Sequence, residues 1–469
     1  MKIKKFFGDK AFYKLALGLI IPVIIQQLIL SIAGYVDNFI INGYDSVAYA
    51  GVSVANRFIF IVNFFWIGIA AGISIFVAQY FGAKMEKHIT GTIQLGIILS
   101  LIFGVISFFL IYYFGPVMIK LFFKEQNSDD LLAIGFGIEY IKVISYGSVI
   151  ILLNFMVSTI YRSLSKPKIP LIAGVIGISA NIIMNYIFIY GYLGVAEMGA
   201  KGAALATVIS KGIELSILVF IAFYYQKDGY AYKIFKKFYL QKSLVIGYLK
   251  KGLPVIANEI LWAFGVTLFA LFITNHNIEW IIAYGYSQNV TDLFFVYYSG
   301  MAVGTSVLIG KTLGESDFTK AKDYFNKLLG LMFISNFIAM ILMVGASPLL
   351  LHFLAGNKEI FMLSYKLILL NVAFIVIYGY TAMCYYTLRA GGDSLRAFLI
   401  DQLPAYLVGL PIVIFLSFME PTWGLGLPLI FLLSKLSDLV KVFFSHYNIK
   451  KGTWLKNIAI EKPKAILET

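Results

Sequence analysis

The chain alternates between long apolar stretches and short polar or Gly/Pro-rich breaks. Runs such as residues 96–110 hold about 15 residues without a charge, and a soluble core cannot hide so many of them. A membrane-spanning helix rises 1.5 Å per residue and needs about 20 apolar residues. The breaks therefore predict twelve spans: residues 14–41, 47–80, 89–114, 131–158, 168–192, 199–225, 248–275, 279–310, 325–347, 360–388, 395–419 and 423–446.

Composition supports the same fold class. Hydrophobic residues make up 60% of the chain and charged residues 13%, whereas a soluble domain averages about 25% charged. This excludes a soluble enzyme, a disordered tail and a disulfide scaffold. The single cysteine, Cys384, cannot form an intramolecular disulfide, and the four histidines show no ligand spacing. We expect an all-α polytopic membrane protein with no enzymatic activity and no bound cofactor.

The basic residues indicate how the chain crosses the membrane. Lys and Arg number 38 against 24 Asp and Glu, giving a net charge of +14. They concentrate in both termini and in alternate loops, around Lys84, Lys166, Lys237, Lys320 and Arg396. Since loops rich in Lys and Arg stay cytoplasmic, both termini are predicted to be cytoplasmic in the inner or plasma membrane. The positive charge then reports topology, and no nucleic-acid partner is expected. The basic N-terminus runs directly into the first span, so we expect it to be retained.

An internal repeat divides the chain. A shift of 232 residues superposes Pro22 on Pro254, Gly72 on Gly304, Gly82 on Gly314 and Pro116 on Pro348. Later, a shift of 227 pairs Arg162 with Arg389, and a shift of 224 pairs Lys211 with Lys435 and Glu214 with Asp438. Glycine and proline matches mark shared backbone requirements.

Each half of the repeat holds six spans, so the halves are parallel repeats about an axis along the membrane normal. We predict an N-lobe (1–226), a linker (227–247), a C-lobe (248–446) and a cytoplasmic tail (447–469), with a central cleft that holds substrate near the midplane. The alternative is an old duplication that serves packing only.

Polar residues inside the first six spans are candidates for ion binding, because a charge at the bilayer centre costs about 2.5–3.5 kcal/mol. Asp37 has no basic residue within one helical turn, so it either binds a cation such as Na⁺ or holds a proton. The alternative is an ion pair with Arg57 on the second span. Asn181 and Asn185 are four residues apart and face one side of the fifth span, and Thr207 lies among small residues of the sixth. Such amides and hydroxyls also bridge helices.

The second half contains three further acids without a local basic partner: Glu259, Asp292 and Asp401. They are candidates for the substrate cavity or for a second ion site. The repeat places Gln27 at the position of Glu259, so Gln27 is included in that group. Two pairs of opposite charge spaced three residues apart are most simply internal ion pairs: Lys211 with Glu214, and Lys435 with Asp438.

These residues resemble the multidrug and toxic compound extrusion (MATE) family over essentially the whole chain. The resemblance rests on residues 22–37, 46–51 (SVAYAG), 78–84 (AQYFGAK), 309–315 (IGKTLGE) and 388–393 (LRAGGD), together with the duplication and a sixth span, 199–210, similar to the family's. It implies an antiporter of the inner membrane that exports small organic cations or amphiphilic drugs in exchange for Na⁺ or H⁺ by alternating access. We expect it to be a monomer in the lipid bilayer.

The resemblance also implies a site. The family's N-lobe ion site maps onto Asp37, Asn181, Asn185 and Thr207. Well-known members carry an acid at the position of Asn185, so here Asp37 is the only charged ligand. Another branch of the family has an acid in the tenth span, in the region that Tyr378 occupies here, and a seventh-span acid about a turn after Glu259. A C-lobe site would therefore be assembled differently from that branch's.

Other functions make different demands on the sequence. A flippase for a lipid-linked oligosaccharide, from the same superfamily, would need basic residues for the pyrophosphate, and Arg57, Lys142 and Lys366 are possible sources. The acids favour a cationic cargo instead. A receptor without transport is disfavoured because the linker and tails are short. An ATP-driven pump is excluded because the chain has no Gly-x-x-x-x-Gly-Lys-Ser/Thr loop.

Overall fold

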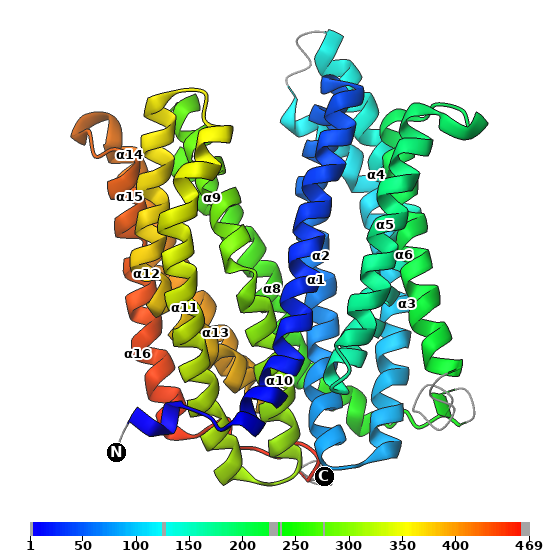
Figure 1. Ribbon diagram of the computed structural model, residues 1–469, viewed down its shortest axis with the longest axis vertical. Helices are drawn as coiled ribbons and strands as arrows, with labels where there is room; N and C mark the ends of the chain where they lie inside the picture. The colour runs from blue at the N-terminus through cyan, green and yellow to red at the C-terminus, as the bar shows by residue number, and fades with distance from the viewer. Residues whose placement is uncertain (1–2, 124–127, 225–232, 235–236, 275–276, 461–469) are drawn as a thin grey trace, which may run out of the picture. The chain divides into compact units, whose positions relative to one another are not determined.

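The computed structural model describes residues 3–123, 128–224, 233–234, 237–274 and 277–460, and these residues form helices without a β-strand (Figure 1). The first half contains α1 (Lys10–Tyr44), α2 (Ser46–Gly82), α3 (Glu86–Phe122), α4 (Ser128–Ser163), α5 (Lys168–Tyr190) and α6 (Gly199–Tyr224). The second half contains α8 (Lys242–Thr274), α9 (Ile278–Phe295), α10 (Tyr297–Gly314), α11 (Phe318–Leu354), α12 (Lys358–Ala390), α13 (Ser394–Pro404), α14 (Leu410–Trp423), α15 (Leu427–Ser434) and α16 (Leu436–Lys451). Short 3-10 turns lie at Ile3–Phe6 and Tyr192–Gly194, and a π-helical turn at Ala405–Gly409 joins α13 to α14.

The predicted all-helical, multi-span fold is confirmed. Among the described residues, ten helical segments are long and apolar enough to cross a membrane, and α9 with α10, bent by 40° at their junction, makes an eleventh. The last predicted span, 423–446, falls on α15 and α16, which do not pass that test. The reason is a polar interruption: Lys435, Asp438 and Lys441 lie within this stretch, and the helix breaks at Lys435.

The repeat is visible in the helix geometry. Pro22 lies inside α1 and Pro254 inside α8, and Pro116 and Pro348 lie inside α3 and α11. Each proline removes one backbone hydrogen bond from its helix. The matched prolines therefore place the same local weakness in corresponding helices of the two halves.

The contacts divide the chain into two compact units that do not follow the helix ends. Unit 1 contains Met1–Ile24, Ala78–Ala83 and Leu253–Thr469, and unit 2 contains Ile25–Val77 and Lys84–Gly252. Helices α1 and α8 thus change unit close to Pro22 and Pro254, and α2 changes unit in its last two turns. The lobe boundaries at residues 226 and 248, which were inferred from the repeat, remain a prediction that this division of contacts does not test.

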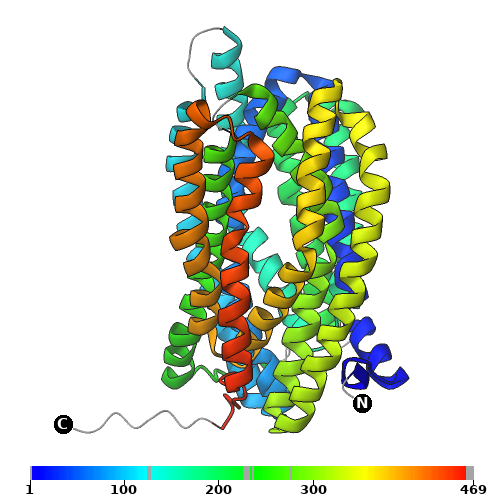
Figure 2. The same cartoon turned by 90° about the vertical axis from the view of Figure 1, so that its left-hand side faces the viewer.

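Each unit has its own packed interior. In unit 1 the buried side chains of α10, α11 and α12 pack with the first turns of α1, and α16 (red in Figure 2) packs against α12, α13 and the π-helical turn. In unit 2, α3 packs against α4 and α4 against α6. There the indole of Trp66 donates to the hydroxyl of Ser107 over 2.9 Å, which satisfies a polar group inside the bundle.

One of the two predicted ion pairs is present. The ammonium of Lys211 lies 2.8 Å from the Glu214 carboxylate. The predicted pair between Lys435 and Asp438 is wrong: among the described residues, Asp438 pairs with Lys441 at 3.9 Å. The Lys435 ammonium instead lies over the ring of Phe431, 4.3 Å from its centroid. Because the helix breaks at Lys435, with ψ −7°, the three-residue spacing no longer places both side chains on one face.

Candidate functional site

The carboxylate of Asp37 on α1 binds two amides of α5. The side-chain nitrogen of Asn185 donates to Oδ1 of Asp37 over 2.6 Å. The Asn181 amide, turned so that its nitrogen faces the same carboxylate, donates to Oδ1 over 3.0 Å and to Oδ2 over 3.3 Å. Both asparagines are buried: Asn181 is 6% exposed and Asn185 is 1% exposed. The four-residue spacing therefore brings two buried amides to one side of α5, against a single carboxylate of α1.

The other groups predicted around Asp37 are placed differently. The hydroxyl of Thr207 donates to the carbonyl of Ala203 on its own helix over 3.1 Å and makes no hydrogen bond with Asp37. The alternative ion pair between Asp37 and Arg57 is absent from the described part of the chain. Asp37 is therefore held by amides, and no base pairs directly with it.

The Asp37 cluster has the donor set for a hard cation or a proton. Oδ1 of Asn185 is buried and has no hydrogen-bond partner among the described residues, so an amide oxygen beside Asp37 is available. Carboxylate and amide oxygens are the ligands that hard cations prefer. No group of three His, Cys, Asp or Glu side chains in the described chain lies close enough to hold a transition metal. A monovalent cation or a proton fits this single carboxylate.

A second polar cluster lies in the same unit and was not predicted. Nη2 of Arg162 on α4 donates to Oε1 of Gln26 over 3.3 Å, and Nε2 of Gln26 donates to the carbonyl of Pro170 over 3.2 Å. Gln27, the predicted candidate, makes no hydrogen bond with another described residue, so its neighbour Gln26 is the one that joins α1 to α4 and α5. The sequence signal was Arg162, which the repeat had already paired with Arg389.

In unit 1, the acid that looked isolated in the seventh span is paired. Oε1 of Glu259 on α8 lies 2.8 Å from Nη1 of Arg389 on α12, and the two side chains are 14% and 13% exposed. The same guanidinium nitrogen donates to the hydroxyl of Tyr385 over 2.6 Å. The sequence-based view of Glu259 as an acid without a basic partner is therefore wrong. Its partner, Arg389, is 130 residues away in the chain but adjacent in space.

Asp401 is paired as well. Its Oδ1 lies 3.1 Å from the ammonium of Lys441 on α16, and its Oδ2 accepts a hydrogen bond from Gln402 over 2.8 Å. Asn258 joins this group to the previous one, because its amide nitrogen donates to the Tyr385 hydroxyl over 3.0 Å and lies 3.3 Å from Oδ2 of Asp401. Four helices of unit 1 thus share one polar network in which both predicted acids are neutralised.

Asp292 and Tyr378 stand apart from that network. Asp292 is exposed on α9, one turn before the bend, and makes no hydrogen bond or ion pair with another described residue. The buried hydroxyl of Tyr378 has no partner either, while its ring packs edge-on against Phe295, with centroids 6.2 Å apart. Asp292 shares no hydrogen-bond partner with Glu259 or Asp401 among the described residues, so the described structure does not assemble these three acids into one site.

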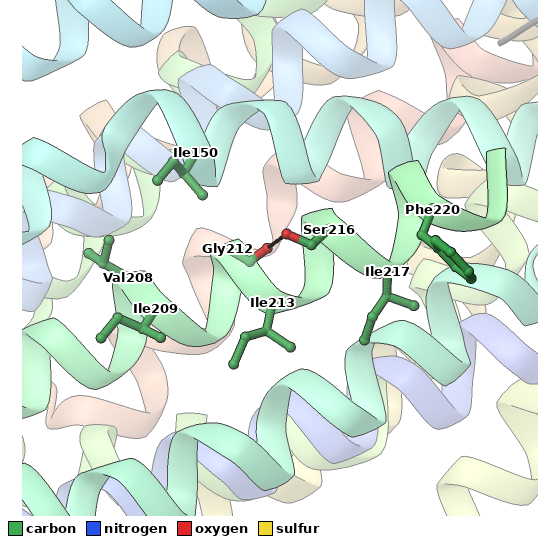
Figure 3. A pocket seen from close by; sticks show the side chains of 8 residues that line it. All are labelled: Ile150, Val208, Ile209, Gly212, Ile213, Ser216, Ile217 and Phe220. Carbon is green, nitrogen blue, oxygen red and sulfur yellow. Dashed lines mark hydrogen bonds between the residues drawn. The ribbon is translucent and has the colours of Figure 1, made fainter. Parts of the chain in front are cut away.

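An apolar groove on α6 does not match the chemistry of these clusters (Figure 3). The Ser216 hydroxyl is turned inward to the carbonyl of Gly212, at 2.7 Å, so the groove offers little polar surface. The lining residues are Ile150, Val208, Ile209, Gly212, Ile213, Ser216, Ile217 and Phe220. An apolar face of this kind on a spanning helix is suited to lipid chains and offers nothing to hold an ion.

Comparison with known proteins places the chain in a family. The family model MatE matches residues 22–187 and again residues 254–418, and the second match begins 232 residues after the first, which is the shift of the internal repeat. The chain is 27% identical over 404 residues to the multidrug resistance protein NorM of Photobacterium profundum, covering 84% of this chain and 86% of that one. It is 22% identical over 403 residues to the probable multidrug resistance protein YoeA of Bacillus subtilis, covering 85% of each.

Solved structures share the fold. A transporter of the MOP superfamily from Pyrococcus furiosus, described as having a binding pocket of reverse polarity, matches with a TM-score of 0.83 and 18% identity over 95% of this chain and 97% of that one. A MATE structure in a bent conformation matches with a TM-score of 0.82 and 20% identity, covering 96% and 98%. This match over nearly the whole chain is consistent with the two-lobe, twelve-helix layout expected from the sequence.

Proposed function

This chain belongs to the MatE family, and from that premise we propose that it exports organic cations in exchange for Na⁺ or H⁺. The names of the relatives from Photobacterium profundum and Bacillus subtilis support drug efflux as the physiological role. The observation that carries the proposal is Asp37, a carboxylate inside a spanning helix that is held by two amides and forms no ion pair with a described residue. A carboxylate in this setting can exchange a cation or a proton without first breaking an ion pair.

The two amides give the coupling ion a structural effect. When Asp37 is charged, both Asn185 and Asn181 donate to it. When a proton neutralises Asp37, the new hydroxyl donates, and the Asn181 amide turns its oxygen toward it. When Na⁺ binds instead, Asp37 and the amide oxygens of Asn181 and Asn185 would hold it. Either event replaces charge-assisted hydrogen bonds between α1 and α5 and so changes which packing of these helices is favoured.

A cationic substrate is recognised by a different acid. Asp292 has no basic partner among the described residues, whereas Glu259 and Asp401 are neutralised by Arg389 and Lys441. An exposed carboxylate on a spanning helix attracts a positively charged ligand. Exchange requires that the coupling ion and the substrate prefer different conformations, because a ligand shifts an equilibrium only by its differential affinity.

The flippase alternative is less well supported. A pyrophosphate cargo needs basic side chains whose charge is available to it. In unit 1, Arg389 and Lys441 each lie within ion-pair distance of an acid, at 2.8 Å and 3.1 Å. An anionic cargo would have to break these pairs before it could bind, whereas an organic cation meets Asp292 directly.

Transport in proteoliposomes tests the proposal. Purified wild-type protein should drive efflux of a fluorescent organic cation under an imposed Na⁺ gradient or pH gradient, and Asp37→Asn should remove the gradient dependence. The matched control is Asp45→Asn, which changes another aspartate near the end of α1 whose role is to accept the backbone N–H of Val47 over 2.6 Å. Efflux by Asp37→Asn at the wild-type rate under both gradients would show that Asp37 is not the coupling site.

A further inference from the structure

The chain that follows α16 is built into the interior of unit 1. α16 ends at Lys451, and the backbone reverses at the next residue, Gly452, whose φ is +71°. Trp454 is then only 2% exposed and packs against Phe325 of α11, with ring centroids 5.9 Å apart. Gly391, in the turn after α12, touches the Trp454 backbone so closely that any side chain there would collide with it. Residues 453–460, which we name the C-terminal strap, are therefore seated as a structural element.

The strap forms hydrogen bonds with two other segments. The amide nitrogen of Asn457 donates to the carbonyl of Gly314 over 3.0 Å and to the hydroxyl of Ser316 over 2.7 Å, in the turn between α10 and α11. The backbone N–H of Ile458 donates to Oε1 of Gln79 over 2.7 Å. Gln79 lies near the end of α2 and is fully buried. Its nitrogen donates in turn to the carbonyl of Ala390, at the end of α12, over 2.7 Å.

Gln79 belongs to the short C-terminal segment of α2 that packs with unit 1, whereas the rest of α2 packs with unit 2. Residues Ala78–Ala83 form part of unit 1, whereas α2 up to Val77 belongs to unit 2. This piece crosses α10 with the backbones in contact: a side chain at Gly82 would strike the Lys311 backbone, and one at Gly314 would strike the Gln79 backbone. The repeat relates Gly82 to Gly314, so the crossing is symmetric, and the strap is added to it on one side.

We propose that the C-terminal strap is a latch that holds the end of α2 against α10 and α12, and that it must leave the turn between α10 and α11, releasing Gln79, during the transport cycle. The inference rests on the proposed function, because alternating access requires helices that pass from one unit to the other to change their contacts. At the point where α2 changes unit, the contacts of its end are backbone crossings and the buried hydrogen bonds of Gln79. The strap therefore stabilises these contacts within unit 1, on the side that the basic residues predict to be cytoplasmic.

A reversible cross-link tests whether the strap must move. The Asn457→Cys, Ser316→Cys double variant places two thiols where a hydrogen bond of 2.7 Å now joins the side chains, and a short bifunctional thiosulfonate can bridge them. The native Cys384 is buried and will not react. We expect the cross-linked protein to lose transport, to keep equilibrium binding of the fluorescent cation, and to regain transport on reduction. Transport by the cross-linked protein at the rate of the unmodified variant would overturn the latch.

A second measurement does not depend on transport. Lys87 in α3 and Lys322 in α11 are both exposed, so Lys87→Cys and Lys322→Cys provide attachment sites for spin labels. Pulsed electron paramagnetic resonance then measures the distance between the two labels. Asn457→Ala removes the two hydrogen bonds from the strap to the turn between α10 and α11, together with the one that Asn457 Oδ1 accepts from the backbone N–H of Ala459, and should raise the weight of a second distance by about tenfold. The control Asn448→Ala removes one hydrogen bond within α16, to the carbonyl of Phe444. If Asn457→Ala gives the wild-type distances, the latch is overturned, whereas failure of ion-driven transport in the unmodified protein would count against the proposed function.

Discussion

Replacing Asn185 by aspartate tests the geometry of the coupling site directly. Asn185→Asp changes an amide that donates to Asp37 over 2.6 Å into a second carboxylate at the same place. It also restores the acid that the family resemblance places at this position. At an effective dielectric constant of about 20, two negative charges at 2.6 Å repel by about 6 kcal/mol. This repulsion exceeds the free energy of a charge-assisted hydrogen bond, which is about 1.5–3 kcal/mol. The two carboxylates therefore cannot both be ionised, and they are expected to share one proton.

The expected result is a change in ion preference. In Asn185→Asp, Na⁺ has to compete with the shared proton, so Na⁺-driven efflux of a fluorescent cation should fall by at least about tenfold relative to efflux driven by a pH gradient. Both rates are measured in the same proteoliposome preparation. Asn185→Ala is the matched control, because it removes the amide without adding a charge and should lower both rates together.

A charge swap separates contact from simple loss of function. The double variant Asp37→Asn, Asn185→Asp moves the carboxylate from α1 to α5 while keeping one acid and one amide in contact. We expect it to recover part of the ion-driven efflux that Asp37→Asn alone loses. If Asn185→Asp transports as the wild type does under both gradients, and the swap recovers nothing, then residues 37 and 185 are not in contact in the working protein and the reasoning fails.

Two further predictions concern unit 1. Arg389→Met leaves the largely buried Glu259 without its base and should lower the free energy of unfolding by about 3 kcal/mol or more. The control Lys233→Met breaks an ion pair of similar length whose side chains are 40% and 61% exposed, and it should change the free energy of unfolding by less than about 1 kcal/mol. Unfolding in detergent micelles, followed by tryptophan fluorescence, compares the two variants. Asp292→Asn should weaken binding of a monovalent organic cation by about tenfold and leave binding of a neutral substrate unchanged, as measured by equilibrium fluorescence titration, and equal loss for both ligands would contradict a charge-recognition role.

The sequence predicted the helices better than their partners. Hydropathy located the spans, because burying backbone in a bilayer forces continuous apolar helices. It could not show that α15 and α16 are separate helices, since the break at Lys435 is a backbone bend within a stretch of otherwise suitable length. The four-residue spacing of Asn181 and Asn185 did predict a common face, and both amides reach Asp37.

Ion pairs between helices were the main omission. Glu259 looked isolated because a search along one helix sees only neighbours within a turn, and its base lies in α12. The repeat contained a usable signal, since it aligned Arg162 with Arg389, two arginines that bind side chains at adjacent alignment positions of α1 and α8. In the first half the partner is Gln26, and in the second half it is Glu259, one position later in the alignment.

The two halves use the same framework with different charges, and this difference indicates where ion coupling resides. The repeat aligns Asp401 with Gly174, where an added side chain would approach Nε2 of Gln26 to 3.2 Å and Oε1 of Glu214 to 3.6 Å. Asp401 occupies the corresponding place beside Asn258 and is neutralised by Lys441. At Glu259 or Asp401, an incoming cation would therefore have to displace Arg389 or Lys441 from its acid. In the first half the described partners of Asp37 are neutral amides, so a cation or a proton can enter and leave without breaking a salt bridge with a described residue. Coupling is therefore expected to depend on Asp37 in unit 2, with the polar network of unit 1 serving to hold its four helices together.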